Sequence, residues 1–259
     1  MVPVYVINMQ RSHDRWQSIT FDLSHHGLVP IRIPAVDGQK IEDAHLVRMG
    51  VSLRTSLGLI GGRQLRQSHW MIDAKGAVGC TLSHIRAWKA LRDNANASYA
   101  VILEDDARME AQDLSGAIAD LTRRNLHSFD LVLLTSSGKI FDPFPGQPHF
   151  IQFNKTSDTS SVHAVTKDFF GTHGYCLSKR AASVLLQYVF PIEQHVDHYI
   201  ASLSRLSLLR VGATSSVLIG RGKSASTISH GLIQSHYMCV AFIVAFISLL
   251  FIWRLRASR

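Results

Sequence analysis

The chain has 259 residues, enough to bury a substantial core as one large domain or two small ones. Its formal net charge is +8, from 27 basic and 19 acidic residues, which suits an anionic partner such as a nucleotide or a membrane surface. The sequence lacks both long runs of like charge and basic patches interleaved with aromatic residues, so we expect no nucleic-acid partner. The three cysteines, Cys80, Cys176 and Cys239, are widely spaced without a Cys-x-x-Cys pair, which argues against a disulfide framework and a zinc-thiolate site and is typical of a reducing compartment.

The first residues predict a strand, a helix and a second strand. Residues 2–7 form a compact, partly β-branched apolar run, and residues 12–23 place Trp16, Ile19 and Leu23 at helical spacing. Residues 31–36 predict the next strand. This order predicts an α/β domain with parallel strands. The start of the chain lacks the features of a signal peptide, so we expect this domain to stay in the cytoplasm.

The rest of the chain continues the alternation of strands and helices. The expected elements, in order, are an irregular glycine- and arginine-rich segment at 50–75, a helix at 81–92, a strand at 100–103, a helix at 114–124, a strand at 129–136, a loop-rich segment at 138–160, a strand running into a helix at 174–189, a helix at 195–206 and a late strand at 208–220.

The last part of the sequence has a different composition. We assign residues 1–220 to one globular domain, 221–236 to a polar linker, 237–253 to an uncharged hydrophobic helix and 254–259 to a basic tail. Such a helix would be about 25 Å long, close to the roughly 30 Å of a hydrocarbon core. A membrane anchor and a buried core helix are the two interpretations, and the adjacent arginines favour the anchor. We expect membrane association with the domain on the cytoplasmic side, and leave the mode of insertion open.

Three carboxylates stand together at the end of the strand predicted at 100–103. Glu104, Asp105 and Asp106 repel one another, yet they follow an apolar run. In open α/β sheets ligands bind beyond the carboxyl ends of the strands. A helix N-cap would explain one carboxylate but not three. The alternative is a divalent cation, held by oxygen ligands and bridged to phosphates.

Several stretches, in order, resemble glycosyltransferase family 25, which includes bacterial lipooligosaccharide sugar transferases and collagen galactosyltransferases. They are VYVINMQRSHDRW, PAVDG, GAVGCTLSHIRAW, VILEDDARM, GTHGYCLSKRAASVLL and PIEQHVD, which lie between residues 2 and 200. Met9, where the family usually has Leu, and the hydrophobic tail depart from the family pattern.

The resemblance implies a GT-A-like nucleotide-sugar-binding fold, α/β with a mostly parallel sheet. It also implies that the acids act as the family's Asp-x-Asp motif and hold Mn²⁺ or Mg²⁺ against the diphosphate of a UDP-sugar. Asp106 is the first choice as metal ligand, with Glu104 and Asp105 completing the shell or contacting ribose. A metal at that position stabilises the charge that develops on the leaving diphosphate.

Residues after the first two strands are candidates for binding the donor. Asn8, Arg11 and Arg15 follow the first strand, and the guanidinium group suits phosphate because it forms paired hydrogen bonds. The alternative for both arginines is a solvated helix start. Asp37 is a candidate for contacting ribose or base, and its alternative is an ordinary Asp-Gly turn.

The helix that precedes the acids contributes further candidates. The resemblance places Ser83 and His84 near the donor, although Ser83 also suits a structural cap. Cys80 and His84 share a helix face, but one thiolate and one imidazole make an incomplete zinc site. His230 is a candidate late metal ligand, and its alternative is an incidental histidine among the 14 in the chain.

The resemblance implies inversion at the sugar carbon, so a carboxylate would remove the proton of the acceptor hydroxyl. Asp197 is the first candidate for this base, followed by Glu193 and Asp168. The alternative for Asp197 is a helix-terminal or salt-bridged aspartate.

The sequence thus predicts a metal-dependent glycosyltransferase that moves a hexose, with galactose expected first, from a UDP-sugar to a lipopolysaccharide-type oligosaccharide or glycolipid acceptor at a membrane surface. Two other functions stay open. One is a metal-dependent nucleotide-sugar phosphohydrolase, and the other is a non-catalytic, membrane-anchored nucleotide-sugar-binding protein.

Overall fold

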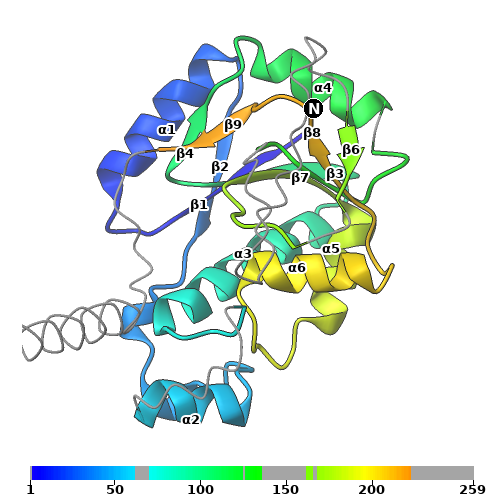
Figure 1. Ribbon diagram of the computed structural model, residues 1–259. Coiled ribbons are helices and arrows are strands. Elements are labelled where there is room, and N and C mark those ends of the chain that lie inside the picture. The colour runs from blue at the N-terminus through cyan, green and yellow to red at the C-terminus, as the bar shows by residue number, and fades with distance from the viewer. Residues whose placement is uncertain (1, 62–69, 125, 136–161, 166–167, 223–259) are drawn as a thin grey trace, which may run out of the picture.

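A seven-stranded sheet forms the centre of the protein (Figure 1). The computed structural model describes residues 2–61, 70–124, 126–135, 162–165 and 168–222. The order of the strands across the sheet is β2-β1-β3-β7-β5-β8-β6. Their bounds are Val4–Asn8 for β1, Pro30–Pro34 for β2, Tyr99–Glu104 for β3, Leu131–Leu133 for β5, Val162–Ala164 for β6, Gly174–Ser178 for β7 and Val211–Thr214 for β8.

The predicted α/β class with a mostly parallel sheet agrees with this arrangement. Strand β1 pairs in parallel with both β2 and β3, and β5 pairs in parallel with β8. Strand β7 lies between β3 and β5 and runs antiparallel to both, and β6 runs antiparallel to β8. The carboxyl ends of β1, β2 and β3 therefore lie at one edge, where a polar site can form.

Helices cover both faces of the sheet (Figure 1). Alternate residues of a strand point to opposite faces, so in β1 Val4 and Val6 pack against one layer of helices while Tyr5 and Ile7 pack against the other. Helices α1 (His13–His25) and α4 (Leu114–Arg124) form the first layer. The second layer consists of α3 (Lys75–Asp93), α5 (Lys179–Tyr188) and α6 (Val196–Arg205). Burial on both faces explains why these strands are continuously apolar.

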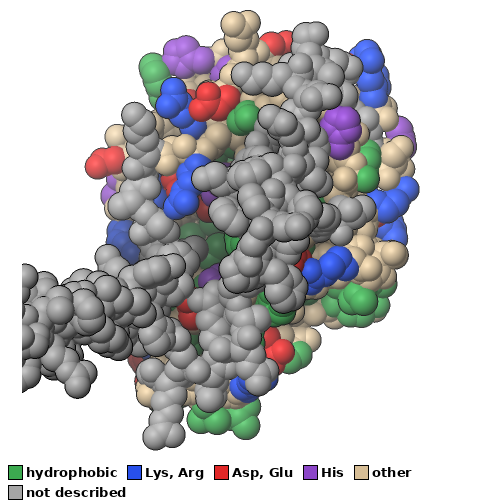
Figure 2. Space-filling view, viewed as in Figure 1, with side chains coloured by type: hydrophobic (Ala, Val, Ile, Leu, Met, Phe, Trp, Pro, Cys, Tyr) green, Lys and Arg blue, Asp and Glu red, His purple; other side chains and the backbone are tan. Residues whose placement is uncertain are grey.

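The prediction that residues 50–75 are irregular was partly wrong, because this segment contains helix α2 (Leu53–Gly61). Leu53, Leu57 and Ile60 of this helix are exposed, and Figure 2 shows hydrophobic side chains gathered at that end of the molecule. Helix α3 begins at Lys75 instead of near residue 81. The late strand is two strands, β8 in the main sheet and β9 (Ile219–Arg221), which pairs with β4 (Ala107–Met109) in a two-stranded sheet.

The described residues do not include the predicted hydrophobic helix at 237–253, the basic tail, nearly all of the predicted linker, or His230. Among the helices of the described ranges, none combines the length and apolarity required to cross a membrane.

Candidate functional site

The three acids lie where β3 leaves the sheet. Glu104 is the last residue of β3, and Asp105 and Asp106 form the turn into β4. Because β1 and β3 are parallel with Ile7 opposite Glu104, Asn8 and Asp105 emerge at the same edge. The backbone then directs the three carboxylates to three different sets of neighbours.

Asp105 is held by groups of the protein itself. One of its oxygens accepts a hydrogen bond of 2.7 Å from the Asn8 side chain, and the other lies 3.1 Å from a guanidinium nitrogen of Arg15. Two of the side chains that were predicted to bind the donor, Asn8 and Arg15, therefore contact Asp105. These contacts stabilise the turn that presents Glu104 and Asp106.

Glu104 points toward helix α3. Its Oε1 accepts a hydrogen bond of 2.7 Å from the Thr172 hydroxyl and lies 3.6 Å from Nε2 of His84. Burial by itself raises the pKa of Glu104. The neighbouring imidazoles of His84 and His173 and the hydrogen bond from Thr172 outweigh burial and lower this pKa to about 2. Glu104 is therefore an anion at neutral pH, as a metal ligand must be.

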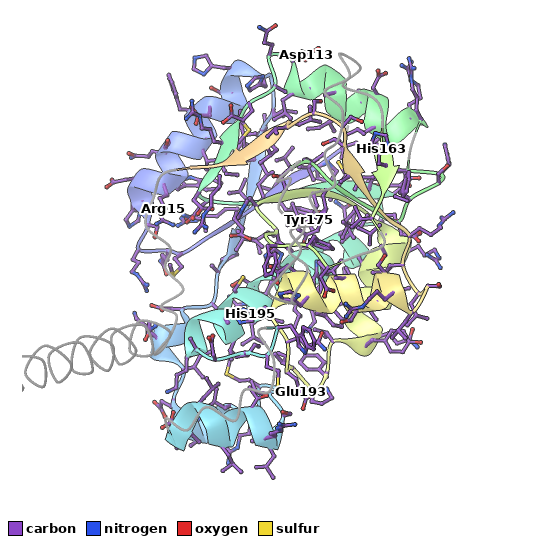
Figure 3. The ribbon with its side chains drawn as sticks, viewed as in Figure 1. Arg15, Asp113, His163, Tyr175, Glu193 and His195 are labelled. Atoms are coloured by element: carbon purple, nitrogen blue, oxygen red, sulfur yellow. The ribbon has the colours of Figure 1, made fainter. Side chains whose placement is uncertain are left out.

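A buried chain of hydrogen bonds fixes the ring of His84. Its Nδ1 lies 2.8 Å from the Tyr175 hydroxyl, which accepts a hydrogen bond of 2.9 Å from the indole N–H of Trp88. Tyr175, labelled in Figure 3, comes from β7, while His84 and Trp88 come from α3. Since Nδ1 is engaged, Nε2 is the nitrogen that faces Glu104.

Asp106 and Glu104 lie close to His173, a third possible metal ligand. The ligand atoms of Glu104, Asp106 and His173 all lie within 4.8 Å of one another. Asp106 Oδ1 and His173 Nδ1 are buried without a hydrogen-bond partner among the described residues. Burial and then the charge of Glu104 raise the pKa of Asp106. Two buried atoms without partners beside a second carboxylate fit a divalent cation, which supplies the missing contacts and offsets the like charge.

A cleft opens beside this cluster, between the ends of β1, β2 and β3 and the start of α3. Its lining residues are Ile7, Met9, Arg11, Ala35, Val36, Asp37, Gly38, Gln39, Gly76, Cys80, Ser83, His84, Glu104 and Asp105. Arg11 is half-exposed and forms an ion pair with Asp37, so this ion pair lies at the rim of the cleft. A concave surface that combines apolar walls with polar groups is a candidate site for a small molecule.

Ser83 shapes the cleft wall from within. Its hydroxyl donates to the Gly79 carbonyl and accepts a hydrogen bond of 2.8 Å from the Val36 N–H. Asp37 accepts from the Gln39 N–H at the start of a 3₁₀ helix, Gly38–Lys40. The loop that carries Asp37 is therefore fixed against α3, and Ser83 is a positioning residue in this structure.

The three candidate bases lie in different surroundings. Asp197 is in the first turn of α6, where one oxygen accepts from the Gly171 N–H at 2.9 Å and the other accepts from the N–H of His198. The contact with Gly171 places Asp197 beside the segment that carries Thr172 and His173.

Glu193 and Asp168 are not brought to the cluster of acids. Glu193 is exposed, in a segment that pairs with residues 50–52 just before α2 (Figure 3). Asp168 is buried in an ion pair with Arg205 of α6. For Asp168 the geometry corresponds to a structural role, because its charge is already balanced.

The sequence motifs did not indicate that His173, Thr172 and Tyr175 are site residues. All three belong to the GTHGYCLS stretch, which contributed only to the resemblance. The chemical signal was a histidine between two glycines, but nothing local indicates that β7 inserts beside β3 and brings this histidine to the acids.

Comparison with known proteins gives a consistent picture. Residues 1–200 match the model of a family described as glycosyltransferase family 25 (LPS biosynthesis protein). A glycosyltransferase 25 family member of Anopheles gambiae is 27% identical over 132 residues, 50% of this chain and 21% of that protein. Procollagen galactosyltransferase 1-B of Xenopus laevis is 27% identical over 190 residues, 71% of this chain and 28% of that protein. Procollagen galactosyltransferase 2 of Homo sapiens is 28% identical over 109 residues, 42% of this chain and 16% of that protein. The chain thus spans less than a third of the length of these relatives.

Proposed function

The chain belongs to glycosyltransferase family 25, and from this premise we propose that it is a metal-dependent, inverting glycosyltransferase of the GT-A type. The donor is a UDP-hexose, with galactose first because relatives are named galactosyltransferases. The acceptor is a lipopolysaccharide-type oligosaccharide, which the description of the family favours.

One observation carries the proposal: Glu104, Asp106 and His173 gather at the carboxyl edge of the sheet, and two of their buried atoms have no hydrogen-bond partner within the part of the chain that the structure describes. These residues would hold Mn²⁺ or Mg²⁺. A bound cation supplies electrostatic stabilisation of the diphosphate leaving group.

The protein's own residues would divide the remaining work. The loop with Asp37 and the rim arginine Arg11 would orient the nucleotide beside the metal ligands. His84 and Thr172 hold Glu104 in its orientation and ionised state. Asp197 would take the proton of the acceptor hydroxyl, since among the candidate bases it is the one held against the 171–173 segment that carries Thr172 and His173.

Membrane association with the domain on the cytoplasmic side is part of this proposal. Its support is the uncharged run at 237–253 followed by Arg254, Arg256 and Arg259. An anchor of this kind would keep the enzyme at the surface where a lipid-linked acceptor lies.

The test is a transfer assay with a panel of UDP-sugars, with and without Mn²⁺ and acceptor. We expect acceptor-dependent release of UDP that requires the metal and falls by more than about a hundredfold in Asp106→Asn. Asp113→Asn is a matched control, because Asp113 is an exposed aspartate outside the cleft whose hydrogen bond from the Gly116 N–H an asparagine can keep. Hydrolysis that no acceptor stimulates would identify a phosphohydrolase instead, and donor binding without turnover would identify a binding protein.

A further inference from the structure

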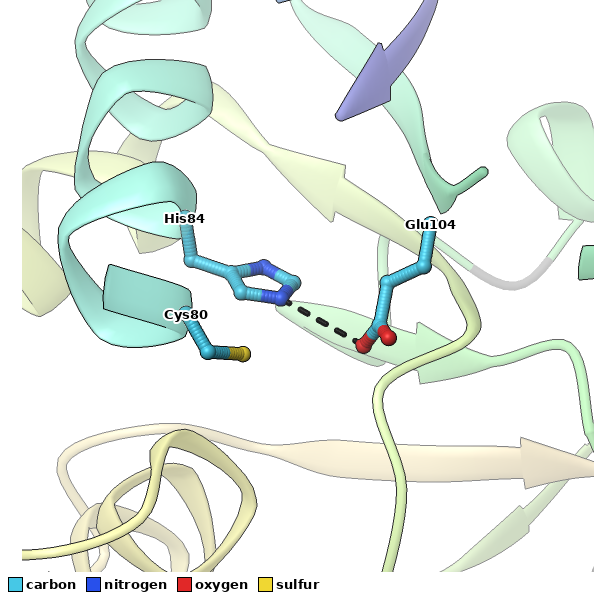
Figure 4. A group of neighbouring side chains, drawn as sticks. All are labelled: Cys80, His84 and Glu104. Carbon is cyan, nitrogen blue, oxygen red and sulfur yellow. Dashed lines mark ion pairs between the residues drawn. The ribbon is translucent and has the colours of Figure 1, made fainter. Parts of the chain in front are cut away.

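Cys80 and His84 occupy successive turns of α3 and face the cleft. From the sequence alone they form an incomplete site for a thiophilic metal. The structure adds a third ligand from β3, because the side chain of Glu104 reaches the same point (Figure 4). The ligand atoms of Cys80, His84 and Glu104 all lie within 4.8 Å of one another.

The three side chains come from rigid elements, and His84 is buried in the wall of the cleft between the partly exposed Cys80 and Glu104. Cys80 and His84 are fixed by the longest helix of the described chain, and Glu104 ends a central strand. Tyr175 contacts Nδ1 of His84, and Nε2 is directed at Glu104. In metal-binding histidines, a hydrogen bond at one ring nitrogen orients the other nitrogen toward the metal in the same way. All three residues line the cleft, so an ion can enter and water can complete its coordination.

Cys80 adds a thiolate, which distinguishes this set from the two carboxylates and the imidazole proposed to hold the catalytic cation. A thiolate, an imidazole and a carboxylate suit Zn²⁺, whereas Mg²⁺ and Mn²⁺ prefer oxygen ligands. Binding through sulfur requires that the Cys80 thiol lose its proton to solvent as the metal–sulfur bond forms. Glu104 belongs to both sets of ligands.

We propose that Cys80, His84 and Glu104 form a second metal site, selective for Zn²⁺, which withdraws Glu104 from the Glu104–Asp106–His173 set when it is occupied. Zinc would then inhibit metal-dependent transfer by competing for a shared ligand. The inhibition rests on the proposed function, but the binding of zinc through Cys80 does not.

The binding experiment uses the full chain and Co²⁺ as a spectroscopic probe for Zn²⁺. We expect one thiolate-bound Co²⁺ per chain, visible as a sulfur-to-cobalt charge-transfer band that Zn²⁺ abolishes. Cys80→Ser should lose the band and weaken Zn²⁺ binding in equilibrium dialysis by more than about tenfold. Cys239→Ser is the matched control, since it removes another thiol of the chain and should keep both signals.

The absence of a thiolate band in the wild type, or its persistence in Cys80→Ser, would overturn the site. A circular dichroism melt in the absence of metal shows whether the variant is folded. If Cys80→Ser is unfolded, Cys80 is instead alkylated in the folded wild type, and peptide mapping confirms the modified position. Loss of the cobalt band after this alkylation is then the expected result.

A second arm measures inhibition, with each protein compared with its own rate in Mn²⁺ alone. Zinc should inhibit the wild type at least about tenfold more strongly than Cys80→Ser. Equal inhibition of both proteins, with the cobalt band present, would refute the competition and keep the site. If no protein shows transfer, the proposed function fails, whereas the cobalt band still decides the metal site.

Discussion

Replacing Asp106 with asparagine should make the metal-free protein more stable while it destroys the response to metal. Asp106 Oδ1 is buried without a partner among the described residues, and Oδ2 lies 3.8 Å from the guanidinium of Arg221. Burial and the nearby charge of Glu104 disfavour the ionised form of Asp106. Asparagine has nearly the same shape and carries no charge, so the substitution removes this repulsion.

The magnitude follows from the direction of the pKa. A carboxyl group whose pKa is raised by folding contributes stability below its ordinary pKa and loses it as the pH rises, so the Asp106 anion destabilises the metal-free protein at pH 7. Optimising one such charge is worth about 1 kcal/mol. For a chain of this size, 1 kcal/mol corresponds to a rise in Tm of about 2–4 °C.

The assay is a thermal melt with and without Mn²⁺. A ligand at a hundred times its Kd stabilises the wild type by about 2.7 kcal/mol, which is a rise in Tm of roughly 5–10 °C. In Asp106→Asn this metal-dependent rise should nearly vanish, while the metal-free Tm is higher than that of the wild type. Asp113→Asn should match the wild type in both measurements.

A metal-free Asp106→Asn protein that melts below the wild type would refute the argument from like charge. An unchanged response to Mn²⁺ in that variant would refute the assignment of Asp106 as a ligand. The two results are separate, because the first concerns the empty protein and the second the bound one.

Asp130→Asn should lower the free energy of unfolding by about 2 kcal/mol, since buried Asp130 accepts hydrogen bonds from the backbone and guanidinium of Arg210. Burial raises the pKa of Asp130, but Arg210 and then Arg180 outweigh burial and hold this pKa below its ordinary value. Urea melts should therefore show the full loss at pH 7 and a smaller loss as the pH falls through the pKa of Asp130 in the folded protein. Ser83→Ala removes the acceptor of the Val36 N–H, and steady-state kinetics should show KM for the donor raised about fivefold with kcat changed less. Gly79→Ala should destabilise by about 1–3 kcal/mol in calorimetry, because the added carbon would lie 2.6 Å from the Val36 carbonyl oxygen.

These three predictions have distinct controls. Gly61→Ala is the control for Gly79→Ala, because a carbon added at Gly61 meets no atom of the described residues within 4 Å. A stable Gly79→Ala protein would contradict the close packing of the 35–38 loop on α3. An Asp130→Asn loss that stays constant down to the lowest pH would contradict the ion pair, and an unchanged KM in Ser83→Ala would separate the loop from donor binding.

Local patterns in the sequence determined the alternation of strands and helices. Ile19 and Leu23 repeat at helical spacing and are buried on α1, and the apolar run before Glu104 is a central strand. These predictions hold because the residues on the buried side of a helix or strand recur at a fixed spacing along the sequence. The position of the acids at a strand end was predicted in the same way.

Only the tertiary structure decided which of the adjacent acids serve which purpose. Asp105 is bound by residues of β1 and α1, whereas Glu104 and Asp106 meet His173, about 70 residues further along the chain. The sequence also predicted that α3 begins only after Gly76 and Gly79, but both glycines lie inside the helix. Gly79 is needed there because it leaves room for the loop that begins at Ala35. Contacts between distant segments depend on how the strands are ordered and on the shapes of packed surfaces, and no local period in the sequence encodes either.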